Sequence, residues 1–115
     1  MRKIAYLGLA LTPLLCPAPA YADGPCSGTV LNSYVTGYGA AIIRGSWGGG
    51  YTQICSITSI WKGVSPDVCA LWVAKIDSAI STGHTVTLYY YGSTTCSTIP
   101  TYGDSPAPYY VMLNS

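Results

Sequence analysis

The chain has 115 residues and a formal net charge of +1, and only 8% of its residues are charged. It contains 11 Tyr and 3 Trp but no Phe, so every aromatic ring carries a polar group. Without an excess of basic residues, nucleic acid and anionic lipid surfaces are poor candidates for its partners.

The first 22 residues have the pattern of a secretory signal peptide. Two basic residues precede the uncharged and mostly apolar residues 4–15, and residues 20–22 (Ala-Tyr-Ala) form a small-x-small cleavage site. The apolar run is shorter than the roughly 20 residues that a membrane span needs, and we expect no span elsewhere. We therefore expect residues 1–22 to be removed on export and residues 23–115 to form one secreted or periplasmic domain.

Cleavage would leave an even number of cysteines in a short exported chain. Such a chain is expected to form disulfides, and four cysteines allow three connectivities. The four are Cys26, Cys55, Cys69 and Cys96. The charged side chains would be Arg44, Lys62 and Lys75 against Asp23, Asp67, Asp77 and Asp104, a net charge of −1.

The first half of the mature chain is rich in β-forming residues. Strands are predicted at residues 29–36, 38–44 and 51–61, and the Gly-rich residues 45–50 are predicted to form a turn or loop between the second and third. These three strands could form an antiparallel meander.

One helix is predicted over residues 66–81. Ser65 suits its N-cap, Pro66 its first position, and Gly83 its C-terminal end. Apolar residues recur there at helical spacing, and we expect them to form one stripe that packs on a sheet. They are Val68, Leu71, Trp72, Ile76, Ala79 and Ile80. The opposite face is small and polar, so it would face water or another subunit.

Two more strands are predicted after the helix, at residues 85–91 and 109–113. An order of three strands, one helix and two strands is that of the OB-fold, a five-stranded, partly open barrel. The fold prediction is therefore an α+β, mainly β, OB-fold-like domain stabilised by two disulfides. Other α+β meanders share the same order of elements.

The helix and the strand after it also suggest which cysteines pair. The predicted helix would be about 24 Å long at 1.5 Å per residue, and a seven-residue strand returning antiparallel would cover about 23 Å. The chain after this strand would then lie beside the start of the helix. We therefore predict the disulfides Cys69–Cys96 and Cys26–Cys55.

Motifs for catalysis are scarce. His84 is the only histidine and directly follows the helix end, so no Ser-His-Asp triad is indicated. The four aspartates are dispersed and suggest no glycosidase pair. Disulfide-bonded cysteines and one histidine could not form a metal cluster. We expect a non-catalytic protein without a metal or cofactor.

Hydroxyl groups and amphipathic rings instead dominate the polar chemistry, as is usual for sugar-binding faces. Tyr and Trp rings stack on apolar sugar faces while their polar tips form hydrogen bonds. The candidate ligand-binding residues are Tyr34, Tyr38, Arg44, Trp47, Tyr51 and Tyr89, with Tyr91 near the last. Packing across neighbouring strands is the competing interpretation for each tyrosine. We expect Trp47, which lies among glycines, to stay out of the core and Trp72 to belong to it.

Residues 72–90 (WVAKIDSAISTGHTVTLYY), preceded by a strand that carries Cys55, resemble the B subunits of subtilase cytotoxin and typhoid toxin. Those subunits also have a signal peptide, an intrachain disulfide, and a helix that ends in a Ser-Thr-Gly turn before a strand. The resemblance implies an OB-fold, a ring of five copies with the helices around a central pore, and outer faces that bind sialylated glycans. None of the family's sugar-contacting residues can be matched to a position in this chain.

Two functional hypotheses follow from the sequence. The first is a secreted, non-catalytic binding domain of the toxin B-subunit kind, with cell-surface glycans as ligands and a homo-pentamer that carries a toxin A subunit. The second is a small secreted or periplasmic structural or inhibitory protein that binds another protein.

Overall fold

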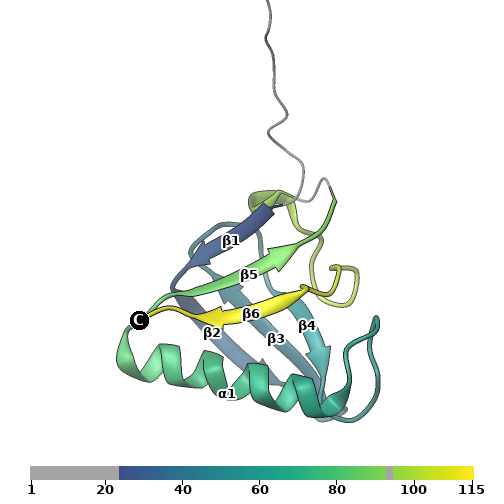
Figure 1. Cartoon of the computed structure of the whole chain (residues 1–115). Helices are drawn as coiled ribbons and strands as arrows, with labels where there is room; N and C mark the ends of the chain where they lie inside the picture. Colours follow the sequence, from purple (N-terminus) through teal and green to yellow (C-terminus); the bar gives the residue numbers. More distant parts are fainter. Residues whose placement is uncertain (1–23, 93–94) are drawn as a thin grey trace, which may run out of the picture.

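Six strands, one α-helix and one 3₁₀ turn make up the part of the chain that the computed structural model describes, residues 24–92 and 95–115 (Figure 1). They are β1 (Gly24–Gly28), β2 (Val30–Val35), β3 (Ala40–Gly45), β4 (Thr52–Ser56), α1 (Pro66–Thr82), β5 (Val86–Tyr90), η3 (Cys96–Thr98) and β6 (Tyr110–Leu113). The predicted signal peptide, residues 1–22, and the predicted mature start at residue 23 lie outside the described residues.

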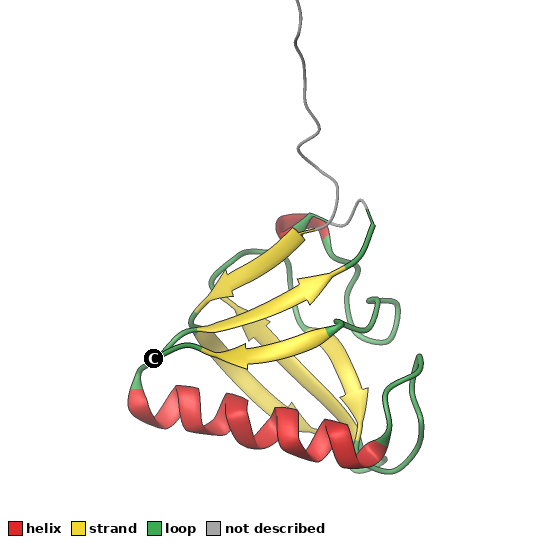
Figure 2. Ribbon diagram, viewed as in Figure 1, coloured by secondary structure: helices red, strands yellow, loops and turns green. Residues whose placement is uncertain are grey.

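The strands form two antiparallel sheets, with the orders β1-β5-β6 and β2-β3-β4. Figure 2 shows one sheet crossing in front of the other, with the helix lying along one side of the pair. Only Thr29 separates β1 from β2, so a short stretch of chain passes from one sheet to the other. The predicted α+β, mainly β domain with two disulfides is therefore confirmed. The described strands close no barrel, because β4 and β6 are not neighbours in either sheet, and the OB-fold is not confirmed.

β1 is a strand that the sequence pattern did not predict. Its residues, GPCSG, include no β-branched or aromatic side chain. It nevertheless pairs along its whole length with β5, from Gly24 opposite Tyr90 to Gly28 opposite Val86. This strand therefore forms because β5, a strongly β-forming partner, provides its hydrogen bonds. The β propensity of its own residues does not predict it.

The disulfides join Cys26 to Cys96 and Cys55 to Cys69, so the predicted pairs Cys69–Cys96 and Cys26–Cys55 are wrong. Because β5 runs antiparallel to β1, the chain that leaves Tyr90 emerges beside the start of β1. The following turn η3 brings Cys96 to Cys26, with 5.6 Å between their Cα atoms. Helix and strand lengths alone could not reveal this pairing, because they leave out β1.

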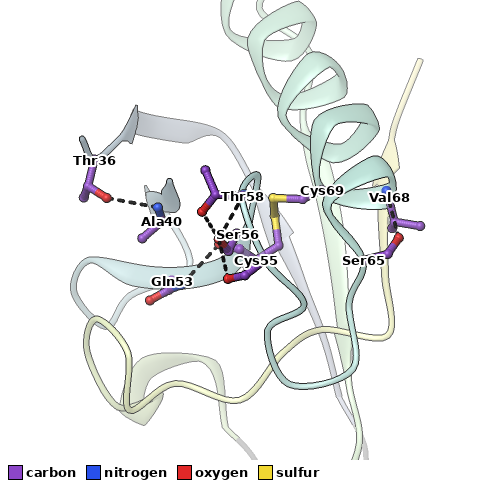
Figure 3. The surroundings of a disulfide bond; sticks show 10 residues. Thr36, Ala40, Gln53, Cys55, Ser56, Thr58, Ser65, Val68 and Cys69 are labelled. Carbon is purple, nitrogen blue, oxygen red and sulfur yellow. Dashed lines mark hydrogen bonds between the residues drawn. A yellow bond between two sulfur atoms is a disulfide. The ribbon is translucent and has the colours of Figure 1, made fainter. Parts of the chain in front are cut away.

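The second disulfide fixes the start of α1 against the β2-β3-β4 sheet (Figure 3). Cys55 lies in β4 and Cys69 lies in the first turns of α1, with 5.5 Å between their Cα atoms. Ser65 caps the helix as predicted, since its Oγ accepts a hydrogen bond of 3.3 Å from the backbone N–H of Val68. The end of the helix is also as predicted, at the left-handed Gly83.

The helix buries a narrower face than the predicted stripe. Its buried residues are Cys69, Trp72, Ile76 and Ala79. Val68, Leu71 and Ile80 are exposed, Leu71 to 65%, so their place in the predicted core-facing stripe is wrong. The disulfide explains the difference, because Cys69 must face β4 and the spacing of three and four residues from Cys69 then sets the buried line.

The third predicted strand is also shorter than expected, because β4 ends at Ser56 rather than at residue 61. Ser56 Oγ lies 3.2 Å from Thr58 Oγ1 and accepts a hydrogen bond of 3.3 Å from the Thr58 amide, which bends the chain out of the strand (Figure 3). Ile57 and Ile60 are consequently exposed. The core itself lies between the two sheets and α1, and Trp72 belongs to it as predicted.

Candidate functional site

Three tyrosine rings converge at one side of the β2-β3-β4 sheet. Tyr34 lies in β2, Tyr51 directly precedes β4, and Tyr102 lies in the loop before β6. The ring centroids of Tyr34 and Tyr51 are 6.0 Å apart, and those of Tyr51 and Tyr102 are 6.3 Å apart with nearly parallel planes. Tyr34 and Tyr102 are 42% and 53% exposed, so the row of rings reaches the solvent.

Arg44 of β3 adds a positive charge to this row. Its guanidinium carbon lies 5.5 Å from the centroid of the Tyr51 ring, within the range of a cation–π interaction. Its Nε donates a hydrogen bond of 2.9 Å to Oδ1 of Asn32. Within residues 24–92 and 95–115 no carboxylate forms an ion pair with Arg44. We call Tyr34, Tyr51, Tyr102 and Arg44 the Tyr51 face.

The register of β2 and β3 explains why these side chains meet. Asn32 stands opposite Arg44 and Tyr34 stands opposite Ile42, after a register shift between Val30 and Asn32. Paired residues of antiparallel strands share a face, and residues two apart along a strand do so as well. Arg44, Asn32 and Tyr34 therefore emerge on the same side, with the buried Ile42 paired to Tyr34.

Hydrogen bonds fix the loop that supplies Tyr102. The amide of Tyr102 donates to the carbonyl of Tyr51 at 2.7 Å, and the amide of Gln53 donates to the carbonyl of Tyr102 at 3.1 Å. Lys62 Nζ donates a hydrogen bond of 2.7 Å to the carbonyl of Ser105, whose own buried hydroxyl donates to the carbonyl of Gln53 at 2.6 Å. Tyr102 has a φ of 52°, a conformation that these bonds hold in place. The Tyr51 face is thus built before any ligand arrives.

The tyrosines of this face affect one another electrostatically. Desolvation raises the pKa of Tyr34 above its ordinary value, and the neighbouring Tyr102, Tyr51 and Tyr38 raise it further. A protonated tyrosine hydroxyl can both donate and accept a hydrogen bond. Tyr38, which is largely exposed, lies near enough to Tyr34 to contribute to this effect.

Most of the predicted ligand-binding residues therefore lie together, namely Tyr34, Tyr38, Arg44 and Tyr51. Tyr102 belongs to the same face but was missed, because the loop that carries it has no periodic pattern from which a position could be inferred. The one clue to it in the sequence was an aromatic residue placed directly before the Gly-Asp of a turn.

Trp47 lies elsewhere and, as expected, is not one of the buried core residues. Its ring is partly buried and packs against the core. It lies directly over Gly45, where an added Cβ would be 2.3 Å from the ring, and beside Gly28. The neighbouring glycines therefore leave room for the indole ring to pack, because a Cβ at Gly45 would occupy the same space.

Tyr89 belongs to a second group of tyrosines, on the β1-β5-β6 sheet. Tyr89 and Tyr110 are partners in the β5–β6 register, and their rings stack with centroids 5.5 Å apart. The ring centroid of Tyr91 lies 5.7 Å from that of Tyr89 and 5.0 Å from that of Tyr109. The ring centroids of Tyr109 and Tyr110 are 6.0 Å apart. We call these four residues the Tyr89 cluster.

The remaining polar groups suggest no other centre. In the described parts of the chain, no group of three or more His, Cys, Asp and Glu side chains could hold a metal ion. His84 is exposed, as its position after the helix suggested. Comparison of the chain with protein-family models, with curated proteins and with solved structures finds no match. The Tyr51 face is therefore the best-defined candidate site.

Proposed function

We propose that this protein is a secreted, non-catalytic binding domain that recognises glycans through the Tyr51 face. The observation that carries the proposal is the convergence of three partly exposed tyrosine rings and Arg44 on one side of a rigid sheet. Tyrosine faces stack on the C–H surfaces of pyranose rings, and their hydroxyl groups bind sugar hydroxyls. Asn32, bonded to Arg44, brings a carboxamide to the same place.

The charge of the Tyr51 face favours acidic glycans. Arg44 uses its Nε on Asn32, and its two terminal NH₂ groups are suited to a bidentate bond with a carboxylate. A sialylated glycan carries such a group, and the resemblance to toxin B subunits implies the same class of ligand. A row of exposed rings also suits the terminal sugars of a cell-surface glycan better than it suits catalysis, for which a deep pocket is usual.

The resemblance adds a fold and an assembly to this proposal. If β1 and β2 are taken as one bent strand, the order is β4-β3-β2/β1-β5-β6, which is compatible with an OB-fold barrel left open between β4 and β6. A homo-pentamer with a toxin A subunit is the corresponding assembly. The exposed Ile80 would give α1 an apolar side chain for contacts between copies.

Export is also part of the proposal, through the predicted signal peptide. Two disulfides in a domain of this size are typical of proteins that fold in an oxidising compartment. In the described ranges, no helix combines the length and the hydropathy that a membrane crossing requires.

A glycan array probed with the oxidised mature protein tests the proposed ligand, and light scattering tests the proposed pentamer. We expect binding to acidic glycans and its loss, by about tenfold, in Tyr51→Ala, since a stacked aromatic contact contributes about 0.5–1.5 kcal/mol beyond its buried area. Tyr110→Ala, which removes a tyrosine from the other sheet, is the matched control and should bind normally. A folded monomer that binds no glycan would refute the proposal.

The second hypothesis, recognition of another protein, is favoured by a different feature of the structure, a pocket at the start of α1.

A further inference from the structure

A pocket of about 430 Å³ lies where α1 begins, and none of the residues of the Tyr51 face lines it. Its lining comes from the turn before α1, from the first two turns of the helix, and from the segments that follow β5 and precede β6. The lining residues that matter here are Lys62, Val68, Trp72, Tyr91, Pro108 and Tyr109. The volume is within the range of about 300–1,000 Å³ that ligand pockets occupy.

Trp72 is a buried hydrogen-bond donor at this pocket. The residue is 8% exposed and belongs to the core, and it also lines the pocket. Its indole N–H donates to no acceptor within residues 24–92 and 95–115. A buried N–H that lacks an acceptor costs about 1–3 kcal/mol. An occupant that brings an acceptor within reach of this N–H would remove that cost.

The other side chains of the lining define the ligand further. The lining side chains include no carboxylate and no carboxamide. Lys62 contributes a positive charge, and its ammonium group donates hydrogen bonds to the carbonyls of Gly103 and Ser105. Such a lining suits a ligand that is rich in acceptors and poor in donors. A sugar offers as many hydroxyl donors as acceptors, but a proline-rich peptide offers carbonyls and has few N–H groups.

Aromatic walls complete this chemistry. Tyr91 and Tyr109 are exposed, with ring centroids 5.0 Å apart, and the buried Trp72 and Pro108 also line the pocket. Grooves lined by Tyr and Trp bind polyproline II segments, because the proline rings pack on the aromatic faces and the extended peptide loses little entropy on binding.

We infer that this pocket binds an extended, proline-rich segment of a partner protein. The site differs from the Tyr51 face in position and in ligand. The domain would thus hold a protein partner at the start of α1 while the other sheet remains available to a glycan.

Fluorescence anisotropy of a labelled decaproline peptide, titrated with the oxidised mature protein, tests the inference. Val68→Trp places a large side chain in the pocket lining, and we expect the affinity for decaproline to fall at least tenfold. Leu71→Trp is the matched control, because Leu71 lies on the same helix and is exposed outside the lining, so this variant should bind normally. Trp72→Phe removes the indole N–H and should weaken binding about threefold to tenfold.

Three results would overturn the inference. The first is binding of decaproline no tighter than that of a Gly-Ser decapeptide, and the second is equal affinities in Val68→Trp and Leu71→Trp. The third is displacement of decaproline by sialyllactose, which would assign the pocket to a sugar. Because Tyr51→Ala should leave decaproline binding unchanged, failure here is distinguishable from failure of the glycan proposal.

Discussion

The two groups of tyrosines lie on different sheets and differ in the neighbours that their rings contact. In the Tyr89 cluster the rings form a closed circuit, since each of Tyr89, Tyr91, Tyr109 and Tyr110 contacts two of the others. On the Tyr51 face the rings form an open row from Tyr34 to Tyr102, with Arg44 beside the middle ring. In the closed circuit Tyr89 and Tyr110 stack on each other across paired strands, while Tyr91 and Tyr109 stay exposed at the pocket beside α1. In the open row the middle ring has a cation as its neighbour. The number of aromatic rings is thus a poorer guide to a binding site than their partners are.

The two sheets also differ in the disulfide that holds each of them. Cys26–Cys96 ties β1 to the turn after β5 and closes a loop with a sequence separation of 70, while Cys55–Cys69 ties β4 to α1 with a separation of 14. Longer loops lose more chain entropy when they are closed. We therefore expect Cys26–Cys96, which holds the sheet with the Tyr89 cluster, to contribute more to the free energy of unfolding than Cys55–Cys69 does.

The largest predicted effect is the loss of Cys26–Cys96. The loop-entropy relation gives a destabilisation of about 4 kcal/mol for a loop of this length, and β1 has little β propensity of its own to compensate. Cys26→Ala with Cys96→Ala should lower the free energy of unfolding by this amount in urea denaturation. A loss below that of the Cys55–Cys69 variant would show that native packing, rather than loop length, sets the contribution.

Loss of Cys55–Cys69 should cost less, about 3 kcal/mol by the same relation. Both of its cysteines are fully buried, and alanine avoids placing a hydroxyl group in the core. We expect Cys55→Ala with Cys69→Ala to unfold at a lower urea concentration than the wild type but at a higher one than the Cys26→Ala, Cys96→Ala variant. If the order of the midpoints is reversed, the two sheets do not differ in the way proposed.

Arg44 distinguishes the two tyrosine groups chemically, and its removal should affect binding more than stability. A hydrogen bond to a charged group contributes about 1.5–3 kcal/mol, so Arg44→Ala should lower the affinity for an acidic glycan by at least about tenfold. Lys75→Ala, which removes an exposed cation from α1, is the control and should bind as the wild type does. Calorimetric titration with sialyllactose measures both, and equal affinities would remove Arg44 from the site.

Much of the fold could be predicted because strong local patterns determine it. The helix start at Ser65, its end at Gly83, and the five strands with alternating or β-branched residues all follow from local preference. β1 could not be predicted, because its stability comes from pairing with β5. The disulfide pairs depend on β1, so they were mispredicted for the same reason. The exposure of Leu71 likewise results from a rotation of the helix that only the correct disulfide defines.

The candidate site could be predicted in part. Strand periodicity and composition suggested Tyr34, Arg44 and Tyr51, and the register of β2 and β3 brings them together. Tyr102 was missed because a hydrogen-bonded loop places it beside β4 from about fifty residues further along the chain. Tyr89 lies on the other sheet, because composition does not reveal which of the two sheets a tyrosine joins.

The smallest predicted effect sharpens the contrast between outward and inward tyrosines of the same strand. Tyr90 follows Tyr89 in β5 but is 1% exposed, and its burial raises the pKa of its hydroxyl well above the ordinary value. Above the unfolded pKa of about 10 the unfolded chain loses this proton and the folded chain keeps it, so stability falls as the pH rises. At about pH 10.5 the loss should be about 1 kcal/mol, and Tyr90→Phe should not show it. Urea midpoints at pH 7 and pH 10.5 measure the difference, with Tyr110→Phe on the outer face as control, and equal alkaline losses in the wild type and Tyr90→Phe would show that Tyr90 does not cause them.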